Sequence, residues 1–112
     1  MRRLINACGY SINGLRAAYR LEDAFRQEVA LAAVMIPAAL LLPVAATGRA
    51  LMLASVILVL IVELLNSAIE AAVDRISLDN HELAKVAKDI GSAAVMLSLV
   101  CTATVWTVIL IG

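Results

Sequence analysis

The sequence predicts an all-α membrane protein, a single domain of three transmembrane helices preceded by an amphipathic helix on the membrane surface. Of the 112 residues, 63% are hydrophobic and the mean hydropathy is +0.97, whereas a soluble domain is roughly 45–50% apolar. A chain of this length cannot bury so much apolar surface in its own interior, so we expect lipid to cover it. Nine basic residues balance nine acidic ones, which leaves no net attraction to nucleic acid.

The N-terminal segment, residues 3–20, has the pattern of a surface helix. Its apolar side chains recur at helical spacing and are Leu4, Ile5, Cys8, Ile12, Leu15 and Tyr19. Arg3, Arg16 and Arg20 lie between or beside them, as in helices that rest at the boundary between lipid and water. The same pattern also suits a helix that faces a partner protein.

Three apolar segments follow, each close to or above the ~20 residues that a transmembrane helix needs. They are residues 29–47, 50–73 and 90–111, and a polar connector at residues 74–88 separates the last two. The first contains Pro37 and Pro43, which membrane helices tolerate, usually with a kink. We therefore expect a multi-pass protein with three spans.

The distribution of lysine and arginine predicts the orientation. Eight of the nine basic residues precede the first span or lie in the connector, and these are Arg2, Arg3, Arg16, Arg20, Arg26, Arg75, Lys85 and Lys88. Only Arg49 lies in the turn between the first two spans. Because basic residues collect on the cytoplasmic side, we expect the N-terminus inside and the C-terminus outside.

A polar stripe interrupts the second span. Glu63, Asn66, Glu70 and Asp74 follow one another at i, i+3, i+7 and i+11, so they share one face of a helix. An ionisable side chain at membrane depth costs a few kcal/mol and commonly has a function. The alternative is that these groups hold helices together by hydrogen bonds within the membrane.

Further charges favour a function for this stripe. Glu22, Asp23 and Glu28 lie at the start of the first span, and Lys88 and Asp89 at the start of the third, all at the expected cytoplasmic ends. Carboxylates gathered in this way repel one another unless a cation lies among them, and Mg²⁺ commonly binds one or two carboxylates together with substrate phosphates.

The combination of charges predicts a reaction class. Lysine and arginine suit phosphate, and a carboxylate set deeper in a low-dielectric environment can exchange a proton near neutral pH. Phosphoryl transfer to a lipid at the membrane surface is the interpretation that uses all these groups. The usual nucleotide motif is missing, because Gly9 to Gly14 is followed by Leu15 and Arg16, where a P-loop has Lys and Ser or Thr.

Four runs of the sequence resemble the prokaryotic diacylglycerol kinases, small integral membrane enzymes, over nearly the whole chain. They are AFRQE (24–28), VELLNSAIEAAVDR (62–75), HELAK (81–85) and AKDIGSAAV (87–95). The resemblance implies a homotrimer in the bacterial inner membrane, with sites built from neighbouring subunits. It also implies that ATP with Mg²⁺ phosphorylates diacylglycerol to phosphatidic acid.

The resemblance also implies roles for individual residues. Glu63 matches the general base and Asn66 the polar neighbour that orients it, while Glu22 and Glu70 match the ligands of the Mg²⁺ that bridges to ATP. The other nucleotide contacts would be Arg3, Tyr10, Asp79, Asn80, His81, Lys88 and Asp89. Besides Glu63, the lipid contacts would be Arg3, Ser11, Arg16, Glu28, Ser92 and Trp106.

Some positions depart from the family pattern or have a second interpretation. Asn80 stands where the family has an aromatic residue, which puts the adenine contact of the segment 79–81 in question. Asn13 and Tyr19 replace Lys and Trp. His81 is equally suited to a solvated loop, and Trp106 to an anchor at the outer membrane boundary.

Three alternative functions remain open at this point. The first is an undecaprenol kinase, which has the same fold and a different lipid alcohol. The second is a small proton-coupled multidrug transporter, which also uses a membrane-embedded glutamate but usually needs four spans. The third is a structural membrane oligomer in which the polar stripe only joins helices.

Overall fold

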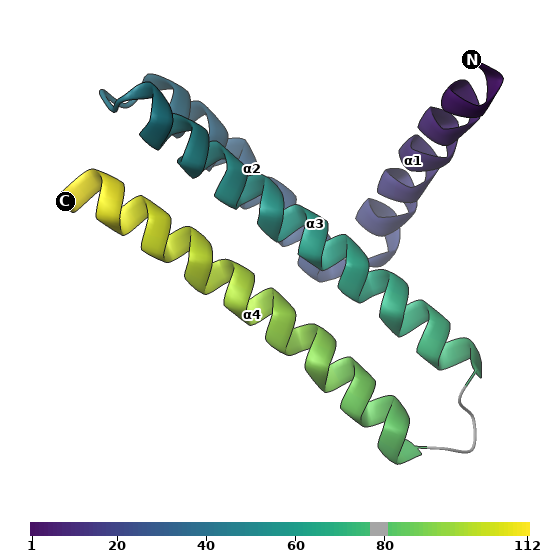
Figure 1. Cartoon of the computed structure of the whole chain (residues 1–112). Helices are drawn as coiled ribbons and strands as arrows, with labels where there is room; N and C mark the ends of the chain where they lie inside the picture. Colours follow the sequence, from purple (N-terminus) through teal and green to yellow (C-terminus); the bar gives the residue numbers. More distant parts are fainter. Residues whose placement is uncertain (77–80) are drawn as a thin grey trace.

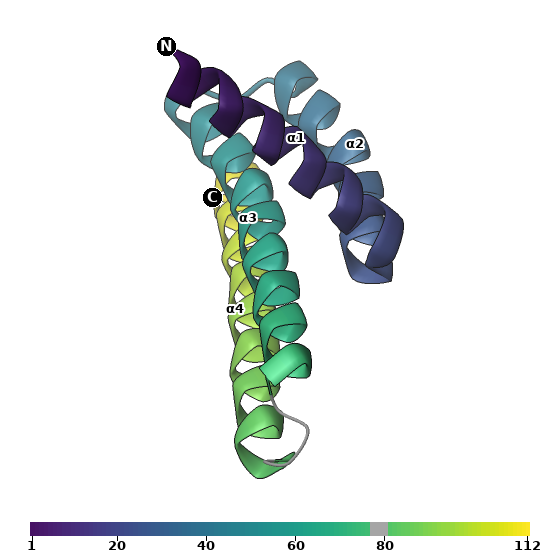
Figure 2. The ribbon, with the colours of Figure 1, turned by 90° about the vertical axis from the view of Figure 1, so that its right-hand side faces the viewer.

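The computed structural model of this chain, which describes residues 1–76 and 81–112, is a helical hairpin with a third helix packed beside it. Its helices are α1 (Arg2–Leu21), α2 (Asp23–Leu41), α3 (Ala46–Ile76) and α4 (His81–Ile111). The antiparallel pair α3 and α4 lies side by side, α2 packs on α3, and α1 leads away from the bundle (Figure 1). Seen from the side, α1 crosses over α2 and α3 (Figure 2).

The expected fold class is confirmed in the described residues. Helices α2, α3 and α4 are each long and apolar enough to cross a membrane. Helix α1 has separate apolar and polar faces, as a surface helix does. The chain is therefore built for a bilayer, with three candidate spans and one amphipathic helix before them.

The helices begin and end at other residues than the apolar segments do. Helix α2 starts at Asp23 and stops at Leu41, although the apolar run continues to residue 47. Leu42 has φ −69° and ψ 146°, the extended conformation that a following proline imposes, so Pro43 ends the helix. Pro37, in contrast, lies within α2.

Two arginines donate hydrogen bonds to carbonyl oxygens at the C-terminal ends of α1 and α2. Glu22 separates α1 from α2 with φ −116° and ψ 113°, and Arg26 Nη1 donates to the carbonyl oxygens of Tyr19 (2.7 Å) and Arg20 (2.9 Å). At the other end of α2, Arg49 donates to the carbonyl oxygens of Ala39 at 3.0 Å, Val44 at 3.2 Å, and Leu40. A cation at a helix C-terminus also complements the helix dipole.

We expect Arg49→Ala to lower the free energy of unfolding by about 1–3 kcal/mol, because hydrogen bonds from a charged donor to two part-buried carbonyls and one exposed carbonyl are lost. Arg49→Lys keeps the charge but not the forked geometry, so it should give an intermediate loss. Equilibrium unfolding in detergent micelles measures both. Equal stability of Arg49→Ala and wild type would show that Arg49 does not hold this turn.

Hydrogen bonds as well as apolar packing join α3 to α4. Thr102 Oγ1 donates to the carbonyl oxygens of Ser55 at 3.0 Å and Ser98 at 3.1 Å. Trp106 Nε1 donates to the carbonyl oxygen of Met52 at 3.3 Å. Such bonds between helices stabilise membrane bundles, where lipid offers no alternative partner.

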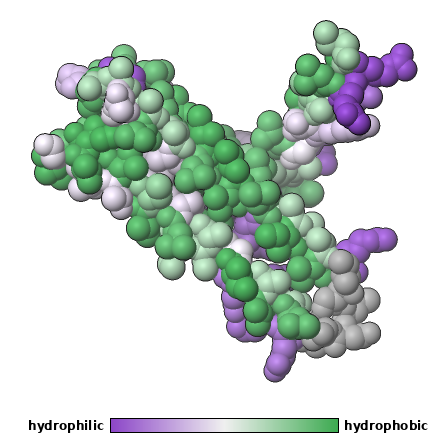
Figure 3. All heavy atoms as spheres, in the orientation of Figure 1, coloured by the Kyte–Doolittle hydropathy of each residue, from purple (hydrophilic) through white to green (hydrophobic). Residues whose placement is uncertain are grey.

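Much apolar surface remains uncovered. The accessible surface is 8001 Å², against about 5,900 Å² for a compact soluble monomer of 11.8 kDa. Hydrophobic residues cover most of the face of the bundle formed by α2, α3 and α4 (Figure 3). Lipid and other protein chains are the two kinds of partner that can cover such a face.

Helix α2 covers only part of α3. It has 19 residues and α3 has 31, a difference of 12 residues or about 18 Å at the helical rise. Because the two helices are joined by the short turn between Leu41 and Ala46, the excess lies entirely at the opposite end, where α3 and α4 project beyond α2 (Figures 1 and 2).

Candidate active site

The first half of the polar stripe of α3, Glu63 and Asn66, faces the inside of the bundle, whereas Glu70 is partly exposed and Asp74 is exposed. Glu63 is 4% exposed, although it lies in an apolar helix, and Glu22, Glu28 and Glu70 are close enough to repel its negative charge. These carboxylates come from α2, α3 and the break between α1 and α2. The three other carboxylates are partly exposed and surround Glu63 loosely, because no three of the four lie close enough together to hold a metal ion. They come from positions up to 48 residues apart in the sequence (Glu22 to Glu70, 70 − 22).

Asn66 joins this cluster to α4. Its side chain is 8% exposed, and its Nδ2 donates to Glu70 Oε1 at 3.2 Å. Its Oδ1 is buried and has no hydrogen-bond partner among the described residues. This oxygen lies against the backbone of Gly91 in α4, so the amide is held between the two helices.

An ion pair lies one turn beyond the cluster, where α3 and α4 project past α2. Lys88 Nζ lies 2.5 Å from Asp74 Oδ1 and connects α4 to the end of the polar stripe on α3. Lys85 Nζ lies 2.8 Å from Asp89 Oδ2 within α4. Two lysines thus border the carboxylate cluster at the end of the bundle away from the α2–α3 turn.

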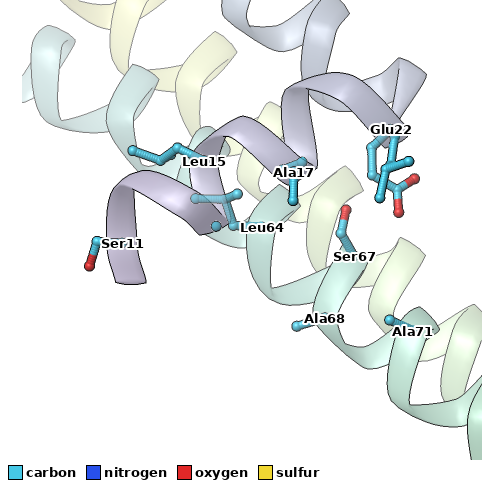
Figure 4. A pocket seen from close by; sticks show the side chains of 11 residues that line it. Ser11, Leu15, Ala17, Glu22, Leu64, Ser67, Ala68 and Ala71 are labelled. Carbon is cyan, nitrogen blue, oxygen red and sulfur yellow. The ribbon is translucent and has the colours of Figure 1, made fainter. Parts of the chain in front are cut away.

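A cavity of about 590 Å³ lies between α1 and α3, within the size range of small-molecule sites. Most of its lining is apolar and includes Leu15, Ala18, Leu64 and Ala68. Ser11 lies at one end, and Glu22 and Ser67 lie toward the other (Figure 4). Glu22 belongs to both the cavity and the carboxylate cluster, so the two adjoin.

Several predicted site residues lie elsewhere in this single chain. Arg3, Tyr10 and Arg16 are exposed on α1, which leads away from α3 toward its N-terminus (Figure 1). Ser92 is exposed on α4. The structure does not bring these side chains to Glu63.

Trp106 lies at a different level of the bundle. Its indole bonds to Met52, which precedes Glu63 by 11 positions (63 − 52), or about 16 Å along a helix. In the monomer Trp106 therefore fastens α3 to α4 well away from the cluster. Asp79 and Asn80 lie outside the described residues, and His81 is the first residue of α4, with no side-chain placement described.

The sequence reasoning missed the residues of α3 that line the cavity. Leu64, Ser67, Ala68 and Ala71 were not named as site residues, because they look like an ordinary apolar or small-residue face. The available signal was the run of small side chains in this part of α3, which leaves room beside a crossing helix. Whether α1 crosses α3 at these residues depends on the angle between the two helices, and no short sequence pattern predicts that angle.

Comparison with known proteins gives a consistent result. A profile of the family described as prokaryotic diacylglycerol kinase matches residues 9–110. A Pseudomonas aeruginosa protein named diacylglycerol kinase is 55% identical over 112 residues, covering 100% of this chain and 91% of that protein. Proteins of the same name from Escherichia coli and Haemophilus influenzae are 50% and 46% identical, covering 96% and 95% of this chain and 88% and 90% of theirs.

The resemblance drawn from the four sequence runs is thus confirmed over almost the entire length. The buried acidic stripe, the three candidate spans and the amphipathic first helix all lie within or next to the matched range. The chain belongs to the prokaryotic diacylglycerol kinase family.

Proposed function

We propose that this protein transfers the γ-phosphoryl group of ATP to the primary hydroxyl of diacylglycerol, giving phosphatidic acid and ADP. The observation that carries the proposal is that Glu22, one of the carboxylates around the buried Glu63, also lines the apolar cavity. An apolar cavity suits acyl chains, and a carboxylate beside it suits a hydroxyl that must lose a proton. Family membership supplies the substrates that fit this arrangement.

Glu63 is the general base of the proposed reaction. Its carboxylate accepts the hydroxyl proton while the oxygen forms a bond to the γ-phosphorus. The bond from that phosphorus to the bridging oxygen breaks, and ADP leaves. Phosphoryl transfer requires mainly positioning and charge stabilisation, and burial of Glu63 at 4% exposure excludes water that would otherwise compete for the proton.

Glu22 and Glu70 are the proposed holders of Mg²⁺. No group of three or more potential metal-binding side chains occurs among the described residues, which suits an ion that takes one or two carboxylates and otherwise binds substrate phosphates and water. Asn66 Nδ2 bonds one oxygen of Glu70 and leaves the other free. When bound, Mg²⁺ would neutralise charge that develops on the transferred phosphoryl group.

The working form is proposed to be a homotrimer with shared sites. Arg3, Tyr10, Arg16 and Ser92 lie away from Glu63 in one chain, and the surface left uncovered is large. Projecting ends of α3 and α4 offer unpaired faces on which a neighbouring chain can place those groups. Lys88 and Asp89, two further contacts predicted for ATP, lie on the projecting end of α4.

The proposed location is the bacterial inner membrane, with the N-terminus and the site on the cytoplasmic side. The excess of lysine and arginine near α1 and around the α3–α4 connection supports it. ATP is a cytoplasmic substrate, and the same side of the bundle holds the carboxylate cluster and both α4 ion pairs. This placement lets the lipid enter laterally while the nucleotide arrives from water.

The decisive test offers diacylglycerol and undecaprenol separately to the purified protein in lipid–detergent micelles with Mg²⁺ and labelled ATP. We expect label to appear in phosphatidic acid and not in undecaprenyl phosphate. Preferential labelling of undecaprenol would keep the mechanism and replace the substrate. A folded sample that labels neither lipid would contradict the proposal and leave the transporter or a structural oligomer as the explanation of Glu63.

A further inference from the structure

Gly91 lies where the backbone of α4 meets the polar stripe of α3 at Asn66. It is buried, and a methyl group added to its Cα would overlap Asn66 Oδ1 and lie 3.2 Å from Asn66 Cγ. The glycine has an ordinary helical backbone, since no glycine in the described residues has positive φ. Its absent side chain, and not its conformational freedom, is what the structure requires.

Asn66 is the group that has to yield when this space is filled. Its Oδ1 has no hydrogen bond to hold it in place, and its only described side-chain bond is the donation from Nδ2 to Glu70. Turning the amide away from Gly91 costs no bond to the oxygen but moves Nδ2 away from Glu70 Oε1. The alternative response, separation of α3 from α4, would disturb the bonds made by Thr102 and Trp106.

We propose that Gly91 is a positioning residue: its missing side chain seats the Asn66 amide, which in turn fixes the carboxylate of Glu70. This inference rests on the proposed function, in which Glu70 binds Mg²⁺ with ATP, and assigns the control of that carboxylate to the opposite helix. Gly91 touches no substrate. It acts through two side chains of α3, and its effect belongs to the nucleotide side of the reaction.

Gly91→Ala tests the proposal, with Gly48→Ala as the matched control. A methyl group at Gly48 also enters the α3–α4 contact but meets the flexible side chain of Ile109 at 3.3 Å. Gly48 is 15 positions from Glu63 (63 − 48), or about 22 Å along the helix. Alanine favours a helix more than glycine does, so neither variant loses helix stability directly.

We expect Gly91→Ala to lower kcat/KM for Mg-ATP by about a hundredfold, as misplacement by about an ångström does. The KM for Mg-ATP should rise while the KM for diacylglycerol stays unchanged, and Gly48→Ala should match wild type in both. A purely structural role would change both substrates alike or lower only thermal stability. Either of those patterns overturns the proposal.

A double-mutant cycle separates action through Asn66 from general loosening of the bundle. In an Asn66→Ala background, Gly91→Ala should change kcat/KM by no more than about twofold, the scatter of independent sites, because the obstructed amide is gone. A loss as large as that in wild type would overturn the proposal. An inactive wild type would instead contradict the proposed function.

A measurement free of turnover completes the test. The side-chain amide resonance of Asn66, assigned by its disappearance in Asn66→Ala, should move in Gly91→Ala and stay in place in Gly48→Ala. This comparison works in micelles even where Asn66→Ala has no activity to measure. An unmoved resonance in Gly91→Ala would show that the amide does not depend on Gly91.

Discussion

Glu63→Gln is expected to abolish phosphorylation of diacylglycerol while leaving the protein folded. An amide cannot accept the hydroxyl proton, and general base catalysis typically contributes about 10²–10⁴-fold, so we expect a loss of about 10³-fold in kcat. Glutamine has nearly the same shape, and it removes the repulsion between Glu63 and the neighbouring carboxylates. Thermal unfolding should therefore occur at or above the wild-type temperature.

Ser55→Ala is the control for this result. Ser55 and Glu63 are both 4% exposed on α3, but Ser55 lies at the level of Thr102, away from the carboxylate cluster, and its backbone oxygen still accepts from Thr102. We expect nearly wild-type turnover. Turnover of Glu63→Gln within a few-fold of the control would remove Glu63 from the role of base.

Glu70→Gln is expected to weaken the response to Mg²⁺ and to leave the response to diacylglycerol intact. The substitution keeps an oxygen that can accept from Asn66 Nδ2 and removes only the negative charge. Loss of an outer partner of a metal ligand costs about 10–100-fold in affinity or activity, so loss of the ligand's own charge should cost at least as much. The Mg²⁺ concentration for half-maximal turnover measures it at fixed ATP.

Asp23→Asn is the control variant, because it removes one negative charge near the site without removing a proposed Mg²⁺ ligand. Asp23 is an exposed carboxylate beside Glu22 and is paired with Arg26, and exposed pairs contribute little to stability. We therefore expect the Asp23→Asn variant to show the same dependence of turnover on Mg²⁺ concentration as wild type. If Glu70→Gln and Asp23→Asn gave the same curve, the loss of one negative charge would explain both and Glu70 would not be a ligand.

The number and type of helices could be predicted from the sequence because each depends on a local pattern. Apolar runs longer than a membrane is thick predict α2, α3 and α4, and alternating basic and apolar positions predict α1. The residues at which the helices begin and end were harder to predict. The break at Leu42 follows from the rule for residues before proline, whereas α3 continues through Asp74 to Ile76, beyond the apolar run, and there Asp74 pairs with Lys88 of α4.

The site was predictable where it lies on one helix. Glu63, Asn66 and Glu70 share a face by spacing alone, and the structure buries Glu63 and Asn66 while leaving Glu70 partly exposed. The seating of Asn66 against Gly91 was not predictable, because it depends on the register between α3 and α4. The spacing of residues along either helix alone does not say which side chain of α3 lies against Gly91.

The contacts assigned to Arg3, Tyr10, Ser92 and Trp106 stay predictions. In the proposed homotrimer, each would depend on which group a neighbouring chain places beside it. The same holds for the roles of Asp79 and Asn80, which lie outside the described residues. Glu22 and Glu28 differ, since their own chain already carries them to Glu63.

The length of α3 has a consequence for the environment in which the protein works. Glu63 lies 17 positions beyond Ala46, the start of the helix (63 − 46), or about 26 Å, and the hydrocarbon layer of a typical bilayer is about 30 Å thick. If the helix enters the layer at Ala46, the carboxylate lies within a few ångströms of the opposite boundary. A thicker bilayer, with longer acyl chains, would then place the Glu63 carboxylate inside the hydrocarbon layer, and a thinner one would place it in contact with water. If Glu63 is the proposed base, the thickness of the host bilayer would then set how much water surrounds the group that accepts the proton.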